Sequence, residues 1–236
     1  MMDFAIEPLA EDALLLRFGD GIDMDINARV HAAARALRAA RLAGIIDIAP
    51  AYATLLVRFD WRDGDALPEA ITKTLDRGFR QGGELGATAS GKSPAQHVEI
   101  PVCYGGEYGP DLDAIVQRAG MTPDQVIACH STATYTVAML GFAPGFPYLL
   151  GLDQALHAPR RAHPRTRVPA GSVAIGGAQT GIYPRELPGG WNLIGRTPLV
   201  LFDPKHEPPC LLAPGDRVRF RAIDADEFRQ LAERGA

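Results

Sequence analysis

The sequence has few cysteines, no excess of positive charge and no long apolar run, and each shortage excludes a class of protein. The three cysteines lie far apart and form no C-x-x-C pair, which argues against both a disulfide framework and a zinc site. A formal net charge of −4 argues against a general nucleic-acid binder. No apolar run approaches the roughly 20 residues that span a bilayer, and no basic segment typical of a signal peptide precedes the first apolar run. We therefore expect a reduced, cytoplasmic protein.

Familiar catalytic motifs are also missing, with one apparent exception. The sequence has no metal-ligand spacing, nucleophile elbow or dinucleotide fingerprint. Gly86, Gly91, Lys92 and Ser93 do match G-x-x-x-x-G-K-[ST], the phosphate-binding loop. That loop leaves a strand and opens a helix, whose first amides surround the phosphates. Here a helix is expected before the pattern and a strand after it, so we interpret the pattern as part of a linker of small residues.

The first third of the chain has the pattern of a small α+β domain. In chain order, the pattern predicts a strand at 12–18, a helix at 26–44 that Gly44 ends, strands at 44–50 and 53–59, and a helix at 67–82. The order β-α-β-β-α predicts a ferredoxin-like sandwich over residues 1–90, closed by one more strand. Residues 96–104 are either that strand or the entry to the next domain.

The remainder, residues 91–236, has the composition of a mainly β domain. Asp111 and Thr122 are placed to cap two short helices, the second with a capping box completed by Gln125. After residue 140, where 12 of the 19 prolines lie, short strand-like segments alternate with Gly/Pro turns. These segments are 171–177, 191–195, 198–202 and 216–223, and a helix is expected at 225–235. The pattern predicts a barrel or a sandwich.

Four arginines within eight positions, Arg160, Arg161, Arg165 and Arg167, form the densest polar cluster. Guanidinium groups bind planar carboxylates and phosphates, and the neighbouring prolines would hold this loop in one shape. The pattern therefore indicates an anion site, with a solvated loop as the alternative.

A glycine-rich segment follows at residues 170–184. Its glycines allow close backbone approach or positive φ, and Gln179, Thr180 and Tyr183 offer neutral hydrogen-bonding groups. This arrangement suits recognition of an amide or a carboxylate, with glycines at barrel corners as the alternative. His130, at a predicted helix C-terminus, either complements the helix dipole or acts as a general acid/base.

Residues 141–152, GFAPGFPYLLGL, are too apolar for an ordinary loop and too rich in proline and glycine for a helix. We expect Phe142 and Leu149 to pack inward, and Phe146 and Tyr148 to line a cleft or to meet a partner. Core packing of the whole stretch is the alternative.

Three long segments resemble the allophanate hydrolase subunit 1 family, which includes the B subunit of 5-oxoprolinase and the Kip-type histidine-kinase inhibitors. The segments are GFAPGFPYLLGL, PRRAHPRTRVPAGSVAIGGAQTGIYP and PGGWNLIGRTPLVLFD. The resemblance is strongest over residues 97–220, and over its whole length the chain is most similar to the 5-oxoprolinase members. The resemblance implies a small α+β domain followed by a cyclophilin-like β-barrel.

The resemblance also implies an activity, the ATP-dependent opening of 5-oxo-L-proline to L-glutamate. It implies work in a complex with two partners, the homologous C subunit and the A subunit of 5-oxoprolinase, and ATP with Mg²⁺ at a shared interface. Phosphorylating the lactam carbonyl oxygen would activate the ring carbon, and such chemistry needs cations and neutral donors. The same family leaves open a non-catalytic inhibitor of a sensor histidine kinase and a carboxyltransferase half of a urea-degrading enzyme.

On this basis we assign expected roles to ten residues and expect no metal ligand. The expected catalytic residues are His130, Arg167 and Gln179; those expected to bind substrate or phosphate are Arg165, Thr180, Tyr183 and Arg196; those expected at a cleft or partner surface are Phe146, Tyr148 and Trp191.

Overall fold

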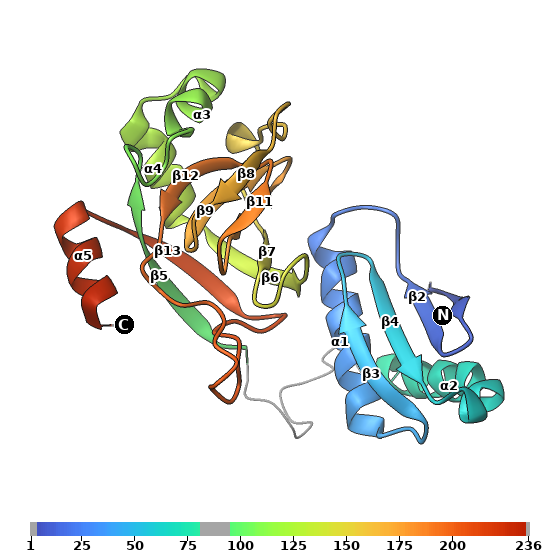
Figure 1. Ribbon diagram of the computed structural model, residues 1–236. Coiled ribbons are helices and arrows are strands. Elements are labelled where there is room, and N and C mark those ends of the chain that lie inside the picture. The colour runs from blue at the N-terminus through green and yellow to red at the C-terminus, as the bar shows by residue number, and fades with distance from the viewer. Residues whose placement is uncertain (1–3, 81–94, 235–236) are drawn as a thin grey trace. The chain divides into compact units, whose positions relative to one another are not determined.

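The computed structural model describes residues 4–80 and 95–234, and the chain divides into two compact units, residues 1–94 and 95–236. Each unit has its own main sheet, as Figure 1 shows. Each also has its own main hydrophobic core. The phosphate-loop pattern at Gly86–Ser93 lies outside the described residues. Within the described ranges, no helix combines the length and the apolar character needed to cross a membrane.

The N-terminal unit is a four-stranded antiparallel sheet with two helices. Its elements are β1 (Ala5–Ala10), β2 (Ala13–Arg17), α1 (Met24–Ala40), β3 (Ile45–Pro50), β4 (Thr54–Phe59), the 3-10 turn η1 (Trp61–Ala66) and α2 (Leu67–Arg80). The strand order is β1-β2-β4-β3. The core lies between sheet and helices, where Leu16, Leu37, Leu55, Ile71 and Leu75 are almost completely buried.

This topology departs from the ferredoxin-like order at the strand that completes the sheet. The predicted order β-α-β-β-α is present from β2 to α2, but the fourth strand is β1, which pairs with β2 at the edge. Pro8 and a largely exposed pattern hid β1 from the sequence analysis, since proline is tolerated in edge strands and not in central ones. Helix α1 also ends earlier than predicted, at Ala40 and not at Gly44, and its C-cap Arg41 has the left-handed conformation (φ 47°).

The second unit is built on a closed seven-stranded barrel. Its elements are β5 (His97–Tyr104), α3 (Leu112–Ala119), α4 (Pro123–Thr132), β6 (Thr134–Leu140), β7 (Pro147–Leu150), the 3-10 turn η2 (Gln154–Leu156), β8 (Arg165–Val168), β9 (Ser172–Gly176), β10 (Gln179–Ile182), β11 (Leu187–Gly189), β12 (Asn192–Arg196), β13 (Arg217–Ile223) and α5 (Ala225–Arg234). The order around the barrel is β10-β7-β6-β13-β5-β12-β9, and β8 and β11 form a separate two-stranded ribbon. Strand β13 runs parallel to β5, so residues 97–104 belong to the barrel and not to the first sheet.

Two local predictions for the barrel unit differ from the structure. Residues 198–202 form no strand; only Phe202 makes an isolated bridge, to Cys210. Pro198 and Pro204 bracket this segment and supply no backbone N–H for a ladder. Helix α4 has the predicted capping box between Thr122 and Gln125, but the Asp111 side chain makes no cap hydrogen bond to α3.

Candidate functional site

Strands β7, β9 and β10 have two different faces, because side chains alternate along a strand. The inner face belongs to the barrel core, with Leu149, Ile175 and Ile182. The outer face carries a second, smaller core that contains Phe146, Val168, Ala174, Tyr183, Trp191 and Leu193. The aromatic side chains of the family-like segments gather on this outer face.

The glycines of residues 170–184 make room for these rings. A Cβ on Gly176 would lie 2.6 Å from the Trp191 indole, and one on Gly181 would lie 3.1 Å from the Phe146 ring. Both distances are too short for a side chain to fit without a shift. The two glycines are therefore positions at which aromatic rings lie directly against the strands.

The rings contact one another edge to face, the arrangement that aromatic pairs prefer. Phe146 lies 5.2 Å from Tyr183 and 5.7 Å from Trp191, and Tyr148 lies 5.8 Å from Trp191, measured between ring centroids. Phe146 is only 2 % exposed, which corresponds to core packing, whereas Tyr148 is half-buried. Trp191 is 5 % exposed and forms the floor of the cluster.

Phe142 behaves in the opposite way to the prediction. Leu149 packs inward as predicted, but Phe142 is 61 % exposed and has a φ of 68°, rare for a residue with a side chain. Its ring nevertheless meets the cluster edge to face, 5.4 Å from Phe146 and 6.3 Å from Tyr183. The loop around it, residues 140–145, lines an open hollow of about 390 Å³ together with Cys210.

A buried carboxylate organises the arginine segment. Asp111, 5 % exposed, accepts hydrogen bonds from Arg161 (2.6 Å) and from both ends of the Arg165 fork (2.7 and 2.9 Å). It also accepts the backbone N–H of Leu193 at 2.8 Å. Burial alone would raise the pKa of Asp111, but the hydrogen bonds from Arg165 and Leu193 and the two positive charges outweigh it and lower the pKa.

The three arginines expected to bind anions all have partners within the chain. Arg165 is held by Asp111, Arg167 donates to both carboxylate oxygens of Glu186, and Arg196 donates to the carbonyl oxygen of Ala170 at 2.7 Å. Arg167 and Glu186 are both exposed, so this pair contributes little to stability. These contacts orient the three guanidinium groups and occupy part of their donor capacity.

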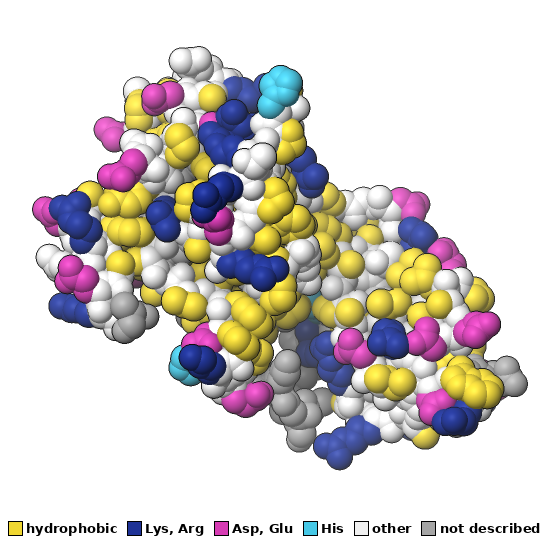
Figure 2. All heavy atoms as spheres, in the orientation of Figure 1, with side chains coloured by type: hydrophobic (Ala, Val, Ile, Leu, Met, Phe, Trp, Pro, Cys, Tyr) yellow, Lys and Arg dark blue, Asp and Glu magenta, His cyan; other side chains and the backbone are white. Residues whose placement is uncertain are grey.

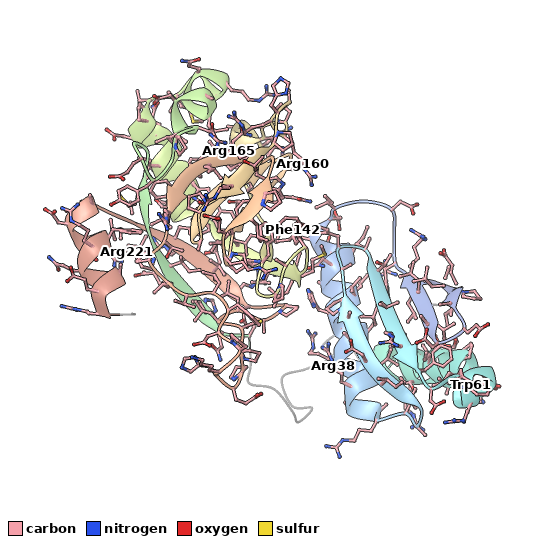
Figure 3. All side chains as sticks on the ribbon, viewed as in Figure 1. Arg38, Trp61, Phe142, Arg160, Arg165 and Arg221 are labelled. Carbon is pink, nitrogen blue, oxygen red and sulfur yellow. The ribbon has the colours of Figure 1, made fainter. Side chains whose placement is uncertain are left out.

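Arg160 is arranged differently. Its guanidinium carbon lies 5.8 Å from the centre of the Trp191 ring, and within the described part of the chain it forms no ion pair. Burial raises the pKa values of the Tyr148 and Tyr183 hydroxyls, and the positive charge of Arg160 opposes this at both. Arg160 thus places a cation over the Trp191 ring of the aromatic cluster. Figure 3 labels Arg160 and Arg165 on the barrel unit. The space-filling view shows Lys and Arg side chains beside hydrophobic ones on this unit (Figure 2).

Gln179 lies on the same outer face. It pairs with Gly176 across β9 and β10, directly beside the position against which Trp191 packs. Its side chain is 8 % exposed, and in the described residues its amide has no hydrogen-bond partner. Its amide atoms reach the surface, where water or a ligand can pair with them.

His130 lies inside the barrel, away from the outer face. Its Nδ1 is 2.8 Å from the Tyr104 hydroxyl and its Nε2 is 3.0 Å from the Thr180 hydroxyl. Thr180 gives its own proton to the Ala174 carbonyl oxygen, so the Nε2–H of His130 donates to Thr180 and Nδ1 accepts from Tyr104. Complete burial lowers the pKa of His130 to about 3. The histidine is neutral at physiological pH, and both ring nitrogens are satisfied.

The structure therefore brings Gln179, Tyr148, Tyr183 and Trp191 together on one face and places His130 and Thr180 in the interior. Sequence reasoning missed the part played by Asp111, which lies 50 and 54 positions from its arginine partners. It also did not separate Arg160 from the other arginines. The sequence shows only that Arg160 stands next to Arg161 in a loop bounded by prolines. It does not show which of the arginines are paired with carboxylates.

Comparisons with known proteins agree with this architecture. Residues 4–212 match the family model described as carboxyltransferase domain, subdomain C and D. The chain is 42 % identical to the 5-oxoprolinase B subunit from Bacillus subtilis over 98 % of this chain and 97 % of the relative.

Two solved structures are similar as well. The conserved uncharacterized protein PH0987 from Pyrococcus horikoshii is 41 % identical, with a TM-score of 0.56, over 95 % of this chain and 100 % of that one. The Kluyveromyces lactis urea carboxylase shares the fold at 20 % identity, with a TM-score of 0.74, over 98 % of this chain and 23 % of that one. The family resemblance seen in the sequence is confirmed: the chain belongs to the family of carboxyltransferase-domain proteins, subdomains C and D, that includes the B subunit of 5-oxoprolinase.

Proposed function

We propose that this chain is the B subunit of an ATP-dependent 5-oxoprolinase, which opens 5-oxo-L-proline to L-glutamate. The observation that carries the proposal is the 42 % identity to a 5-oxoprolinase B subunit over nearly the whole length of both chains. The outer face of the barrel supports it, because within the described residues it offers a guanidinium group without an ion-pair partner, an amide without a hydrogen-bond partner and an apolar floor.

The chemistry explains why the reaction needs ATP and more than one chain. A lactam is a resonance-stabilised amide, and transfer of a phosphoryl group to its carbonyl oxygen makes the ring carbon a better electrophile. Such a step needs cations or dipoles where negative charge develops. We propose that the homologous C subunit and the A subunit complete the site, that ATP is consumed by the assembled complex, and that the complex works in the cytoplasm.

Mg²⁺ would be expected to accompany ATP, but the described residues do not form a site for it. Nowhere in residues 4–80 and 95–234 do three His, Cys, Asp or Glu side chains come together as metal ligands would. We therefore derive no step through a metal ion in this chain. The residues of this chain bind and orient the lactam, while His130, neutral and enclosed, supports the barrel from inside.

The test is reconstitution of the complex. The purified A and C subunits from the same organism are incubated with ATP and 5-oxo-L-proline, with and without this chain, and L-glutamate is measured. We expect glutamate to form only when this chain is present. Equal formation without it would refute the enzyme assignment, and inhibition of a sensor histidine kinase by the chain alone would support the regulatory alternative.

A further inference from the structure

We infer that Gln179 and Arg160 together recognise a lactam that carries a carboxylate, Gln179 through the ring amide and Arg160 through the acid group. This inference rests on the proposed function and adds to it a binding mode and the chain that provides it. The sequence predicted Arg165, Arg167 and Arg196 as anion binders. The inference assigns this role to Arg160, which has no ion-pair partner in the described structure.

The state of the Gln179 amide is the first observation. The residue is more than nine-tenths buried, and its amide oxygen and nitrogen reach the surface without a hydrogen-bond partner among the described residues. The exposed part of the residue therefore includes the amide group, which is available to a ligand. The remaining 8 % of exposed surface gives a ligand access to this position.

The chemistry of a carboxamide fits a lactam better than an open-chain amide. The Gln179 carboxamide has an N–H donor and a C=O acceptor side by side. A lactam ring holds its own N–H and C=O on one side of the amide bond, so both groups can pair with a single carboxamide. Open-chain secondary amides strongly prefer the trans form, which points the two groups in opposite directions. Gln179 thereby selects the cyclic amide.

Arg160 supplies the second point of recognition. Its guanidinium group lies over Trp191, and stacking on an aromatic face leaves the planar fork free to bind a carboxylate. The ring of Trp191 lies against Gly176, the cross-strand partner of Gln179. Tyr148 lies 5.8 Å from the same indole ring. Gln179, which would bind the amide, and Arg160, which would bind the carboxylate, therefore both lie next to Trp191.

The test uses the reconstituted complex with this chain changed at one position. Arg160→Gln and Gln179→Met should each raise the KM for 5-oxo-L-proline about tenfold to a hundredfold, the effect expected when one charged or paired hydrogen bond is lost. kcat should change much less, because these contacts form in the ground state as well. Gln179→Met removes no partner inside the described part of the chain, so its Tm should stay level or rise. A structural role for Gln179 would lower it.

Matched controls are Arg219→Gln on β13 and Gln117→Met on α3, both exposed. Neither should change KM. Direct binding to the full chain is measured in parallel by calorimetry with 5-oxo-L-proline, 2-pyrrolidinone, L-proline and N-acetylglycine. 5-Oxo-L-proline should bind best, and Arg160→Gln should abolish its advantage over 2-pyrrolidinone, which has no carboxylate. Gln179→Met should abolish its advantage over N-acetylglycine, whose amide is open-chain.

The outcomes separate this inference from the proposed function. Glutamate formation with an unchanged KM in both variants would overturn the inference and leave the function standing. If the complex forms no glutamate, the function fails, and calorimetry decides the inference. Selective lactam binding that both variants lose would uphold the inference, and the absence of such binding would overturn it.

Discussion

At the scale of single residues, Asp111 and His130 show that buried polar groups set the geometry around the site. Asp111 holds two arginines and one backbone N–H, and His130 joins Tyr104 to Thr180 inside the barrel. Both side chains are enclosed and hydrogen-bonded. A change at either position should therefore lower the stability of the barrel unit.

Asp111→Asn should destabilise the barrel unit by about 2 kcal/mol, because it leaves two partly buried guanidinium groups without their counter-charge. Urea unfolding followed by circular dichroism measures this loss. Asp113→Asn, an exposed change two positions further along the chain, serves as the control and should cost almost nothing. Equal costs for the two variants would show that the arginine cluster is held by other contacts.

His130 should make stability depend on pH below neutrality. Its folded-state pKa of about 3 lies below the ordinary value of 6.5, so between these values the unfolded chain binds a proton that the folded chain does not. The contribution of His130 to the free energy of unfolding is complete above pH 6.5 and is lost as pH falls toward 3. Over this range the free energy of unfolding falls with a slope of up to about 1.4 kcal/mol per pH unit. Unfolding by urea at a series of pH values gives this slope.

His130→Gln should reduce the slope of unfolding free energy against pH by the amount that corresponds to about one bound proton. His163→Gln, at an exposed position, should leave this slope unchanged. The imidazole signals of His130 in the wild-type protein give a second measurement, independent of whether the variant folds well. Titration of these signals near pH 6.5 would show that the ring is reached by water.

At the scale of elements, glycines and aromatic rings work as pairs across strands. For the glycines of residues 170–184, the sequence predicts either a recognition site for an amide or a carboxylate or the corners of a barrel. The structure shows that the Trp191 and Phe146 rings approach two of these glycines. A pairing between residues distant in the chain depends on strand register, which local patterns do not encode.

Gly176→Ala should displace the Trp191 ring, since the new methyl group would lie 2.6 Å from it. Overpacking of this kind costs about 1–3 kcal/mol. In a Trp61→Phe background, the fluorescence of Trp191 should shift to longer wavelength as the ring gains contact with water. Gly190→Ala places its methyl group at ordinary contact distance from Pro164 and should leave the emission unchanged. An unchanged spectrum in Gly176→Ala would contradict the packing described for Trp191.

At the scale of the molecule, the two units have separate main cores in the described residues, one against the four-stranded sheet and one inside the barrel. Composition and element order predicted an α+β part before a β-rich part, because prolines and short strands concentrate after residue 140. Strand β1 and the absence of a strand at residues 198–202 were not predicted. Edge strands and proline-bracketed segments depend on tertiary pairing more than on local preference.

Leu55→Ala tests the independence of the two cores. Leu55 is completely buried in the N-terminal core, and its truncation should cost that unit about 2–5 kcal/mol. Hydrogen exchange should speed up in β2 and β4 while β5 and β13 keep their protection. Equal loss of protection in both units would show that they unfold together.

The parallel pairing of β13 with β5 has a consequence for how the barrel forms in the cell. Arg221 and Glu99, an ion pair across these strands, are 122 positions apart. During synthesis β5 leaves the ribosome long before its neighbour exists, so its edge stays open while most of the unit is translated. Closing so large a loop is slow. We expect the nascent barrel unit to depend on chaperone protection until residues 217–223 emerge.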